Sequence, residues 1–319
     1  MAELGIDVSK ETLDMTLLKA NEPEQTKQVA NQTKGFKQVQ RWLTKQQVQQ
    51  VHVCLEATNI YWEEAAEFFH QQGHLVSVVN PARISGFAQS QLRRNKTDPL
   101  DGEVIAQFCA AVEPELWTPP TPEQRHLRAL VRHQQALQKT LTQQTNRLAT
   151  CREPAVQASL ERLSAFLEAE IEQVEQQIQA FIQQQADLKR QYDLLNSIKG
   201  IGPKTAVVLL AEMYDLANYE SARAAAADAG LTPRHHTSGQ TIRRKPKLSK
   251  MGKSAVRGAL FLPAITAMQH NPFVRALKER LEARGKHWKV IVGAAMRKLL
   301  HLAYGVLKNQ TPFDPNYSR

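Results

Sequence analysis

Two hydrophobic periods alternate along the first third of the chain. Apolar runs typical of buried strands fall at residues 4–8, 12–18, 28–30, 51–56 and 74–79. Apolar positions at helical spacing fall at residues 34–45 and 60–72. The resulting order of three strands, helix, strand, helix, strand is that of an RNase-H-like sheet, and we expect an α/β unit of this kind at the N-terminus.

The middle of the chain changes to a long, Gln-rich helical pattern. Trp117-Thr118-Pro119-Pro120 marks the boundary, and Glu153-Pro154 separates segments 123–149 and 155–194. Leu and Ile at helical spacing in both segments predict an antiparallel helical hairpin. Two interpretations remain open: a coiled coil that joins two copies of the chain, and a helical bundle packed within one subunit.

The last third is predicted to be mostly α-helical, with a single loop rich in Gly, Lys and Arg. The expected helices are residues 204–213, 221–229, 254–268, 272–284 and 289–308. A length of 319 residues fits two or three folding units. The changes of pattern place the expected domains at residues 1–118, 119–193 and 194–319.

Positive charge is concentrated in that last third. The whole chain has a formal charge of +10, whereas residues 196–319 carry 21 Lys/Arg against 7 Asp/Glu, or +14. Such a field attracts phosphate polyanions, although a basic protein without a nucleic-acid partner is the alternative. Eight of the basic residues fall between Leu231 and Leu260, where there is no acid. Those expected to contact phosphates are Arg234, Arg243, Arg244, Lys245, Lys247, Lys250 and Lys253.

The apolar pattern and the cysteines indicate the expected cellular location. There is no run of about 18 apolar residues and no secretory signal, so we expect a cytoplasmic protein without a membrane partner. Cys54, Cys109 and Cys151 are far apart in sequence and are expected to be reduced thiols.

Four acidic residues fall at element ends. Asp7 lies on the first predicted strand, Glu56 ends the fourth, and Asp98 and Asp101 share one face at a helix start. If the four converge, their oxygens can hold two Mg²⁺ ions, or Mn²⁺, for phosphoryl transfer. Each also has a structural alternative: a turn at Asp7, a surface ion pair at Glu56, and a helix cap at Asp98-Pro99.

A glycine-containing turn between two helical segments resembles the helix-hairpin-helix nucleic-acid motif. Its backbone N–H groups, the following helix N-terminus and a lysine can face a phosphate. The expected contacts are Lys199, Gly200, Gly202, Lys204 and Thr205. The alternative is an ordinary helix–turn–helix corner.

Ser238 is the first of two residues in a Ser-Gly turn within the basic loop. Surrounding cations can stabilise a serine alkoxide and the charge that develops on an attacked phosphate. Other hydroxyls compete for this role: Thr237, Thr241, Ser249 and Ser254. From these residues alone, attack by water or a 3′-OH driven by two metal ions is expected, with Ser238 as a phosphate contact.

Together these motifs resemble the DEDD-type transposases of bacterial insertion sequences, which recombine DNA under the guidance of a structured bridge RNA. The resemblance spans the chain and rests on Gly5-Ile6-Asp7, Leu55-Glu56-Ala57-Thr58, Arg94-Asn95-Lys96-Thr97-Asp98 with Asp101, Gly200-Ile201-Gly202, Ala229-Gly230-Leu231-Thr232-Pro233-Arg234, Ser238-Gly239 and Met296-Arg297-Lys298. Asn59 departs from the glycine that the family often has there, at a position that is not a ligand.

The resemblance implies a RuvC-like N-terminal domain in which Asp7, Glu56, Asp98 and Asp101 match the four acidic positions. It also implies that Ser238 is the nucleophile, forming a 5′-phosphoserine link and releasing a 3′-OH. The metal-binding acids would act from the partner subunit. The expected assembly is a dimer of dimers on the RNA, a donor DNA and a target DNA, with the coiled coil joining subunits.

Two other functions fit parts of the pattern. A RuvC-like junction-resolving nuclease would need the four acids and would leave no protein–DNA link. A non-catalytic RNA- or DNA-binding scaffold would need the basic third without the acids. The ordered set of acids favours catalysis.

Overall fold

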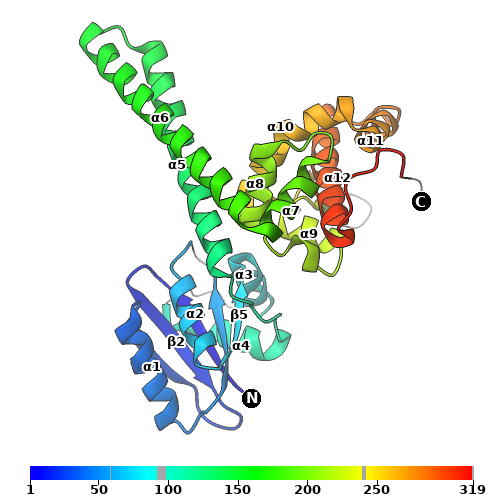
Figure 1. Ribbon diagram of the computed structural model, residues 1–319. Helices are drawn as coiled ribbons and strands as arrows, with labels where there is room; N and C mark the ends of the chain where they lie inside the picture. The colour runs from blue at the N-terminus through cyan, green and yellow to red at the C-terminus, as the bar shows by residue number, and fades with distance from the viewer. Residues whose placement is uncertain (58, 92–97, 239–241, 318–319) are drawn as a thin grey trace. The chain divides into compact units, whose positions relative to one another are not determined.

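The computed structural model describes residues 1–57, 59–91, 98–238 and 242–317, with the backbone alone for residues 98–101, 234–238 and 242–247. The chain divides into two compact units, Met1–Pro119 and Pro120–Arg319 (Figure 1). Each unit has its own hydrophobic core and is described by itself.

A five-stranded mixed sheet forms the centre of the first unit. Its strands are β1 (Ala2–Val8), β2 (Thr12–Leu18), β3 (Gln25–Ala30), β4 (Val51–Glu56) and β5 (Leu75–Val79). Their order in the sheet is β3-β2-β1-β4-β5, with antiparallel pairing from β1 to β3 and parallel pairing from β1 to β5. This is the RNase-H-like strand order, and it confirms the prediction from the hydrophobic pattern.

Helices cover both faces of this sheet. They are α1 (Thr33–Lys45), α2 (Glu63–Gln71), α3 (Pro81–Ser90) and α4 (Asp98–Val112). Phe36 and Phe69, from α1 and α2, are buried in one core cluster, whereas Ile84 and Ile105, from α3 and α4, are buried in another. The sequence pattern does not predict α3, which follows directly after the strand predicted at residues 74–79. Asn80 caps α3 by accepting a hydrogen bond from the Ala82 N–H at 2.9 Å.

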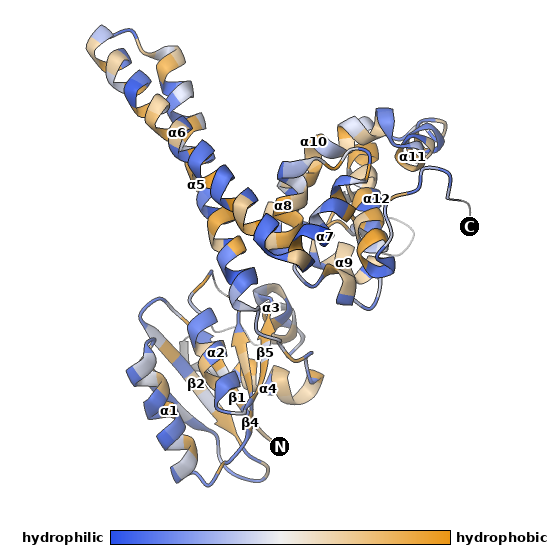
Figure 2. Cartoon of the chain, viewed as in Figure 1, coloured by the Kyte–Doolittle hydropathy of each residue, from blue (hydrophilic) through white to orange (hydrophobic). Residues whose placement is uncertain are grey.

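The second unit begins with a long helical hairpin of α5 (Pro122–Thr150) and α6 (Pro154–Gln184) (Figure 1). The apolar residues of α6 form a stripe along its length, as the hydropathy colouring shows (Figure 2). Its buried members are Leu160, Leu167, Ile171, Val174, Ile178 and Ile182. The single helix predicted to Leu194 is wrong, since Gln185 has extended backbone angles and separates α6 from α7 (Ala186–Asn196). This break lets α7 bury Leu194 and Leu195 in the core of the unit.

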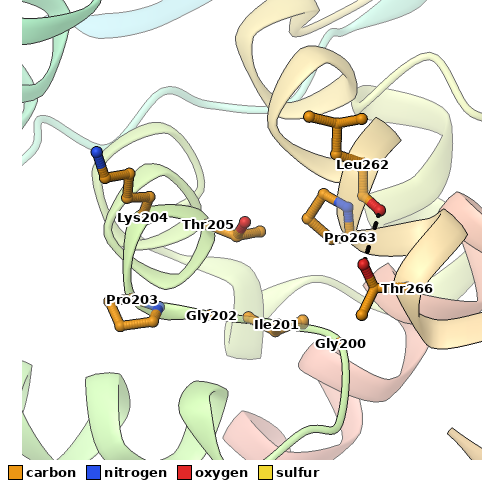
Figure 3. Close-up of a pocket in the computed structure, with 9 residues that line it drawn as sticks. All are labelled: Gly200, Ile201, Gly202, Pro203, Lys204, Thr205, Leu262, Pro263 and Thr266. Atoms are coloured by element: carbon orange, nitrogen blue, oxygen red, sulfur yellow. Dashed lines mark hydrogen bonds between the residues drawn. The ribbon is translucent and has the colours of Figure 1, made fainter. Parts of the chain in front are cut away.

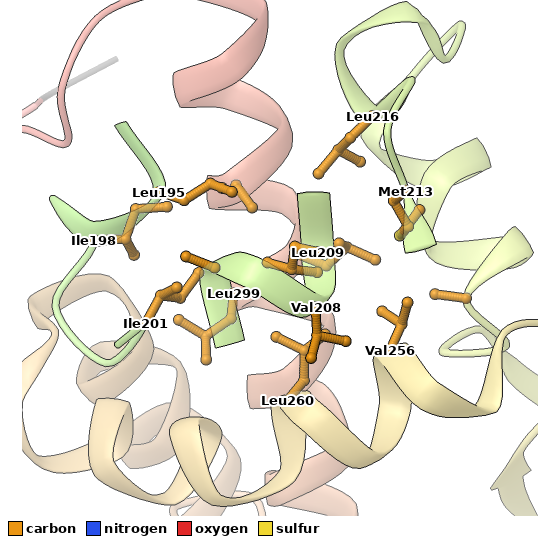
Figure 4. Close-up of a cluster of buried hydrophobic side chains, with 14 of the residues drawn as sticks. Leu195, Ile198, Ile201, Val208, Leu209, Met213, Leu216, Val256, Leu260 and Leu299 are labelled. Atoms are coloured by element: carbon orange, nitrogen blue, oxygen red, sulfur yellow. The ribbon is translucent and has the colours of Figure 1, made fainter. Parts of the chain in front are cut away.

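A helical core fills the rest of the second unit. It contains α8 (Pro203–Glu212), α9 (Ala222–Asp228), α10 (Ser254–His270), α11 (Pro272–Glu282), α12 (Trp288–Asn309) and a 3₁₀ turn at Leu216–Asn218. Leu209, Leu260 and Leu299, from α8, α10 and α12, are buried against one another (Figure 4). Among the described residues, α12 alone is long and apolar enough to cross a membrane, but ten of its residues are buried in this core.

The basic segment predicted to be a loop forms a two-stranded antiparallel ribbon, so that prediction is wrong. Its strands are β6 (Pro233–Ser238) and β7 (Ile242–Leu248), with an irregularity between Arg234 and His236. A polar two-stranded ribbon needs no alternating apolar face, and the hydrophobic pattern therefore could not reveal it. Leu248 lies against α12, where a Cβ added to Gly293 would be 3.2 Å from the Leu248 Cδ1.

Candidate catalytic and nucleic-acid-binding sites

Asp7 and Glu56 lie at the same edge of the sheet. The parallel strands β1 and β4 pair from Ala2 opposite Val51 to Ile6 opposite Leu55, and Asp7 and Glu56 occupy the next positions. Both side chains are half-buried. Adjacent parallel strands end at one edge, so the fold brings these two predicted acids to neighbouring backbone positions.

The sheet also places an acid that the sequence interpretation missed. Asp14 on β2 is directly opposite Asp7, and opposed residues of antiparallel strands point to the same face. The Asp14 carboxylate accepts a hydrogen bond from Gln28 Nε2 at 2.8 Å. Asp14 therefore adds negative charge beside Asp7. The sequence carried no signal for it, because the β1–β2 register is a tertiary feature.

Helix α4, whose first turn carries Asp98 and Asp101, packs on β1 and β2 through Gly102 and Ala106. A Cβ added to Gly5 would be 2.2 Å from the Ala106 nitrogen and 2.3 Å from the Gly102 carbonyl oxygen, so the helix backbone lies directly on β1. A Cβ added to Gly102 would be 3.3 Å from the Asp14 carbonyl oxygen. The residue after Asp101 is therefore beside the Asp7–Asp14 strand pair.

Among the side chains that the structure describes, no three His, Cys, Asp or Glu residues come together as a metal site. Two of the four expected ligands, Asp98 and Asp101, are described by backbone alone. Carboxylate oxygens at a sheet edge are the donor type that Mg²⁺ and Mn²⁺ prefer, so the residues present fit such an ion. Of the motif residues, Thr58, Arg94, Asn95, Lys96 and Thr97 lie outside the described residues.

The glycine turn between α7 and α8 is held firmly on the helical core. Gly200 has a φ of +106°, and a Cβ added to it would be 2.7 Å from the Ala267 Cβ on α10. The fully buried Asn271 donates from Nδ2 to the Lys199 carbonyl oxygen at 2.9 Å. Glycine is therefore required at position 200 both for its backbone conformation and for the close approach of α10.

The turn is open on its other side. Gly202 has a φ of −98°, and a Cβ added there would have no neighbour within 4 Å. Gly202 occupies the N-cap position before α8, and no side chain caps this helix. A cavity of about 480 Å³ adjoins the turn, with Leu262, Pro263 and Thr266 of α10 on its far side (Figure 3). Uncapped N–H groups at a helix start suit an anion.

The side chains of Lys204 and Thr205 have partners within the unit. Lys204 Nζ lies 2.6 Å from Glu175 Oε1 on α6, although the lysine side chain is 80% exposed. The buried Thr205 donates from Oγ1 to the Ala259 carbonyl oxygen at 3.4 Å. Lys199 is exposed. At Thr205, therefore, the backbone N–H is the group available to a ligand, not the hydroxyl.

Ser238 is the last residue of β6 and pairs with Ile242 on β7. On the same ribbon, Thr237 is opposite Arg243 and Arg234 is opposite Lys247. The ribbon backbone thus places several predicted phosphate contacts on the strand beside Ser238. Gly239 and Thr241 lie outside the described residues.

Two lysines follow the ribbon. Lys250 is exposed, with a φ of +56°. Lys253 Nζ lies 3.1 Å from Asp228 Oδ2, and Tyr219 donates from its hydroxyl to the same oxygen at 2.6 Å. Burial and the Asp228 carboxylate raise the pKa of the Tyr219 phenol. Tyr219 therefore stays protonated and anchors the end of this segment.

Further cations lie on the second unit. Burial, reinforced by Arg297, Lys298 and Arg223, lowers the pKa of His301 to about 4. Arg297 donates from Nε to the His301 Nε2 at 3.4 Å, as expected for a neutral imidazole. The positive charge noted in the sequence therefore extends over α9 and α12.

Two protein-family models match the chain. Residues 4–151 match a DEDD-type model described as "Transposase", and residues 192–279 match one described as "Transposase IS116/IS110/IS902 family". The first match covers the sheet that carries Asp7 and Glu56. The second covers the glycine turn and the ribbon.

Similar proteins span nearly the whole chain. The "Pilin gene-inverting protein" of Moraxella bovis is 32% identical over 314 residues, covering 98% of this chain and 97% of the relative. The protein of the same name from Moraxella lacunata has the same identity and coverage. The "Transposase for insertion sequence element IS1328" of Yersinia enterocolitica is 28% identical over 281 residues, covering 78% and 81% of the two chains.

Proposed function

Because the chain belongs to the IS116/IS110/IS902 family of transposases, enzymes that cleave and transfer DNA strands, we propose that it is an RNA-guided DNA recombinase of an insertion sequence. A structured guide RNA would select a donor and a target DNA. The basic character of residues 196–319, at +14, supports a nucleic-acid partner of this size. We expect the recombinase to act in the bacterial cytosol.

We assign the nucleophile to Ser238. Its Oγ attacks a DNA phosphate, the Oγ–P bond forms as the P–O3′ bond breaks, and the serine proton is passed to the released 3′ oxygen. The cations on β6 and β7 stabilise the charge that develops on the phosphate. The resulting 5′-phosphoserine keeps the bond energy for rejoining, which a free phosphate would lose.

The four acids of a RuvC-like domain are assigned to divalent-metal binding. Asp7, Glu56, Asp98 and Asp101 would hold Mg²⁺, or Mn²⁺, which supplies Lewis-acid stabilisation of the phosphate oxygens when bound. The observations that support this assignment are that Asp7 and Glu56 occupy neighbouring positions at the ends of β1 and β4, and that Gly102, the residue after Asp101, lies beside β2. In a composite site these acids would serve the serine of a partner subunit.

We also propose how the remaining segments contribute. Domains at residues 1–118, 119–193 and 194–319 would separate metal binding, subunit association and nucleic-acid binding. The α5–α6 hairpin would act as the coiled coil of a dimer, and two dimers would assemble on the nucleic acids. Consistent with this role, Val156, Leu163 and Phe166 on α6 are exposed although large and apolar.

Strand exchange is favoured over simple hydrolysis by the names of the Moraxella relatives. Inverting a gene requires cutting at two sites and rejoining the ends in a new order, and these relatives cover almost the full chain. A RuvC-like junction-resolving hydrolase, or a scaffold that only binds RNA and DNA, lacks the rejoining step.

The experiment measures strand cleavage and rejoining by the purified chain with guide RNA and two labelled DNAs. Asp7→Asn and Glu56→Gln should each reduce cleavage by about 10²-fold or more, because each removes a charged metal ligand. Adding EDTA should abolish cleavage, and Mn²⁺ should restore it. Glu63→Gln, a half-buried acid on α2, is the matched control. Full cleavage by Asp7→Asn or in EDTA would contradict the metal assignment.

A further inference from the structure

A solvent-exposed tryptophan lies where the loop after α11 joins α12. Trp288 begins α12, and its side chain is 47% exposed, next to Val290 at 49%. The other three tryptophans have ring or hydrogen-bond partners: Trp62 contacts Trp117 edge to face, and Lys27 lies over Trp42. No such partner contacts the Trp288 indole among the side chains that the structure describes.

The backbone around this indole is fixed on both sides. Gly285, with a φ of +63°, ends α11 by donating its N–H to the Glu282 carbonyl oxygen at 2.8 Å, and the Lys286 N–H reaches the Leu281 carbonyl oxygen at 3.1 Å. His287 then caps α12, because its Nδ1 accepts from the Lys289 N–H at 3.2 Å. The two caps hold Trp288 in place, so little ordering is needed when a ligand stacks on it.

Positive charge is concentrated in the sequence around Trp288. Residues 283–298 contain five cations and no acid, and they are Arg284, Lys286, Lys289, Arg297 and Lys298. The first three lie within four residues of Trp288, and all three are exposed. The nearest acids in sequence are Glu279 and Glu282 on α11, and Glu282 lies 3.8 Å from Lys278. An apolar protein surface would not match the charges of Arg284, Lys286 and Lys289, whereas a nucleic acid would complement both the ring and these charges.

We propose that Trp288 is a stacking platform for an unpaired nucleotide, with Arg284, Lys286 and Lys289 binding the flanking phosphates. An unpaired base offers a flat π-face of indole size, and a base in a duplex has its faces covered by its neighbours. The site rests on the proposed function, since it needs a nucleic-acid partner with unpaired segments. It lies beyond residues 192–279, which match the C-terminal family model.

Binding by the full-length protein tests this site. The probes are short labelled oligouridylate, oligothymidylate and a duplex closed at both ends. Trp288→Ala should weaken single-strand binding about 5- to 150-fold, corresponding to 1–3 kcal/mol of stacking, and should change duplex binding less than about twofold. Trp288→Phe should lose less than Trp288→Ala. The RNA and DNA probes separate the two sources of an unpaired nucleotide, and a selective loss with either one supports the site.

Controls separate stacking from charge and from misfolding. Lys308→Ala removes an exposed cation at the other end of α12 and should bind both kinds of probe nearly as well as wild type. Trp288 is the only tryptophan after residue 119, so its fluorescence, taken as wild type minus Trp288→Phe, should be quenched by single strands. The thermal midpoint of Trp288→Ala should match wild type, since the side chain is half-exposed.

Two results would overturn the proposal. One is unchanged single-strand binding by Trp288→Ala, and the other is an equal loss for single strands and duplex, which would mean a general charge contact. These results are distinguishable from failure of the proposed recombinase. A chain that stacks single strands through Trp288 but neither cuts nor joins DNA would contradict only the recombinase.

Discussion

Two glycines in one turn have different roles. Gly200 is constrained by a positive φ and by Ala267, whereas Gly202 has an ordinary φ and open space around it. Of these two glycines, only Gly202 is not required by the fold. Under the proposed function, the open side would allow a phosphate to approach the start of α8 closely.

This difference predicts that substitution by alanine affects stability at position 200 and DNA binding at position 202. Gly200→Ala should lower the free energy of unfolding by about 1–3 kcal/mol, because alanine is strained there and overlaps Ala267. Gly202→Ala should leave stability nearly unchanged but weaken DNA binding, because its Cβ would occupy the open face. Urea unfolding and a DNA-binding titration check both variants. Equal destabilisation by the two substitutions would mean that the open side of the turn has been misassigned.

His301 predicts a pH dependence of stability. Its pKa is about 4 in the folded chain, against an ordinary value near 6.5 in the unfolded chain. Between these values the unfolded chain binds the proton and the folded chain does not, so stability falls as the pH drops below about 6.5 and levels off below about 4. The loss between pH 7 and pH 5 should be on the order of 1 kcal/mol.

His301→Gln removes the titrating group and should flatten this part of the stability profile. Thermal unfolding of both proteins at pH 7 and pH 5 gives the comparison. The same pH-induced loss in wild type and His301→Gln would show that another group is responsible.

At the scale of elements, the hydrophobic pattern predicted most of the helices and strands and missed a few. It predicted the five strands of the sheet and the helices α1 and α2. It missed α3, and it missed the break at Gln185, which has no Pro or Gly to mark it. The β6–β7 ribbon has polar residues on both faces, so only backbone pairing defines it.

In the candidate site, too, some residue positions could be predicted from the sequence and others depend on tertiary packing. The positions of Asp7 and Glu56 near strand ends could be predicted, because parallel neighbours end together. Asp14 could not, since its position opposite Asp7 depends on the register of a hairpin. The inward hydroxyl of Thr205 and the Lys204–Glu175 ion pair also depend on tertiary packing and had no sequence signal.

Two adjacent residues on α6 test the role of the hairpin. Leu167 is 6% exposed and Phe166 is 59% exposed. Leu167→Ala should destabilise the chain by about 2–4 kcal/mol, because it leaves a cavity between α5 and α6. Phe166→Ala should leave unfolding unchanged but weaken self-association, measured by sedimentation. Unchanged association by Phe166→Ala would show that this face of α6 does not join subunits.

At the scale of the whole molecule, the residues assigned to the proposed reaction are divided between the two units. Met1–Pro119 supplies carboxylates at a sheet edge, and Pro120–Arg319 supplies the basic ribbon, the glycine turn and Ser238. The positive charge concentrated in residues 196–319 lies entirely in the second of these units. A composite site formed between subunits would make cleavage depend on assembly, so that DNA is cut only when both partner strands are held.

The most direct test of the account is a search for a covalent protein–DNA adduct. The purified chain, guide RNA, Mg²⁺ and end-labelled DNA would be separated on a denaturing gel, with Ser238→Ala and Asp7→Ala run beside wild type. We predict an adduct in wild type that maps to Ser238 and is absent from both variants. Cleavage without an adduct, unaffected by Ser238→Ala but abolished by Asp7→Ala, would contradict the serine mechanism and identify a metal-dependent hydrolase.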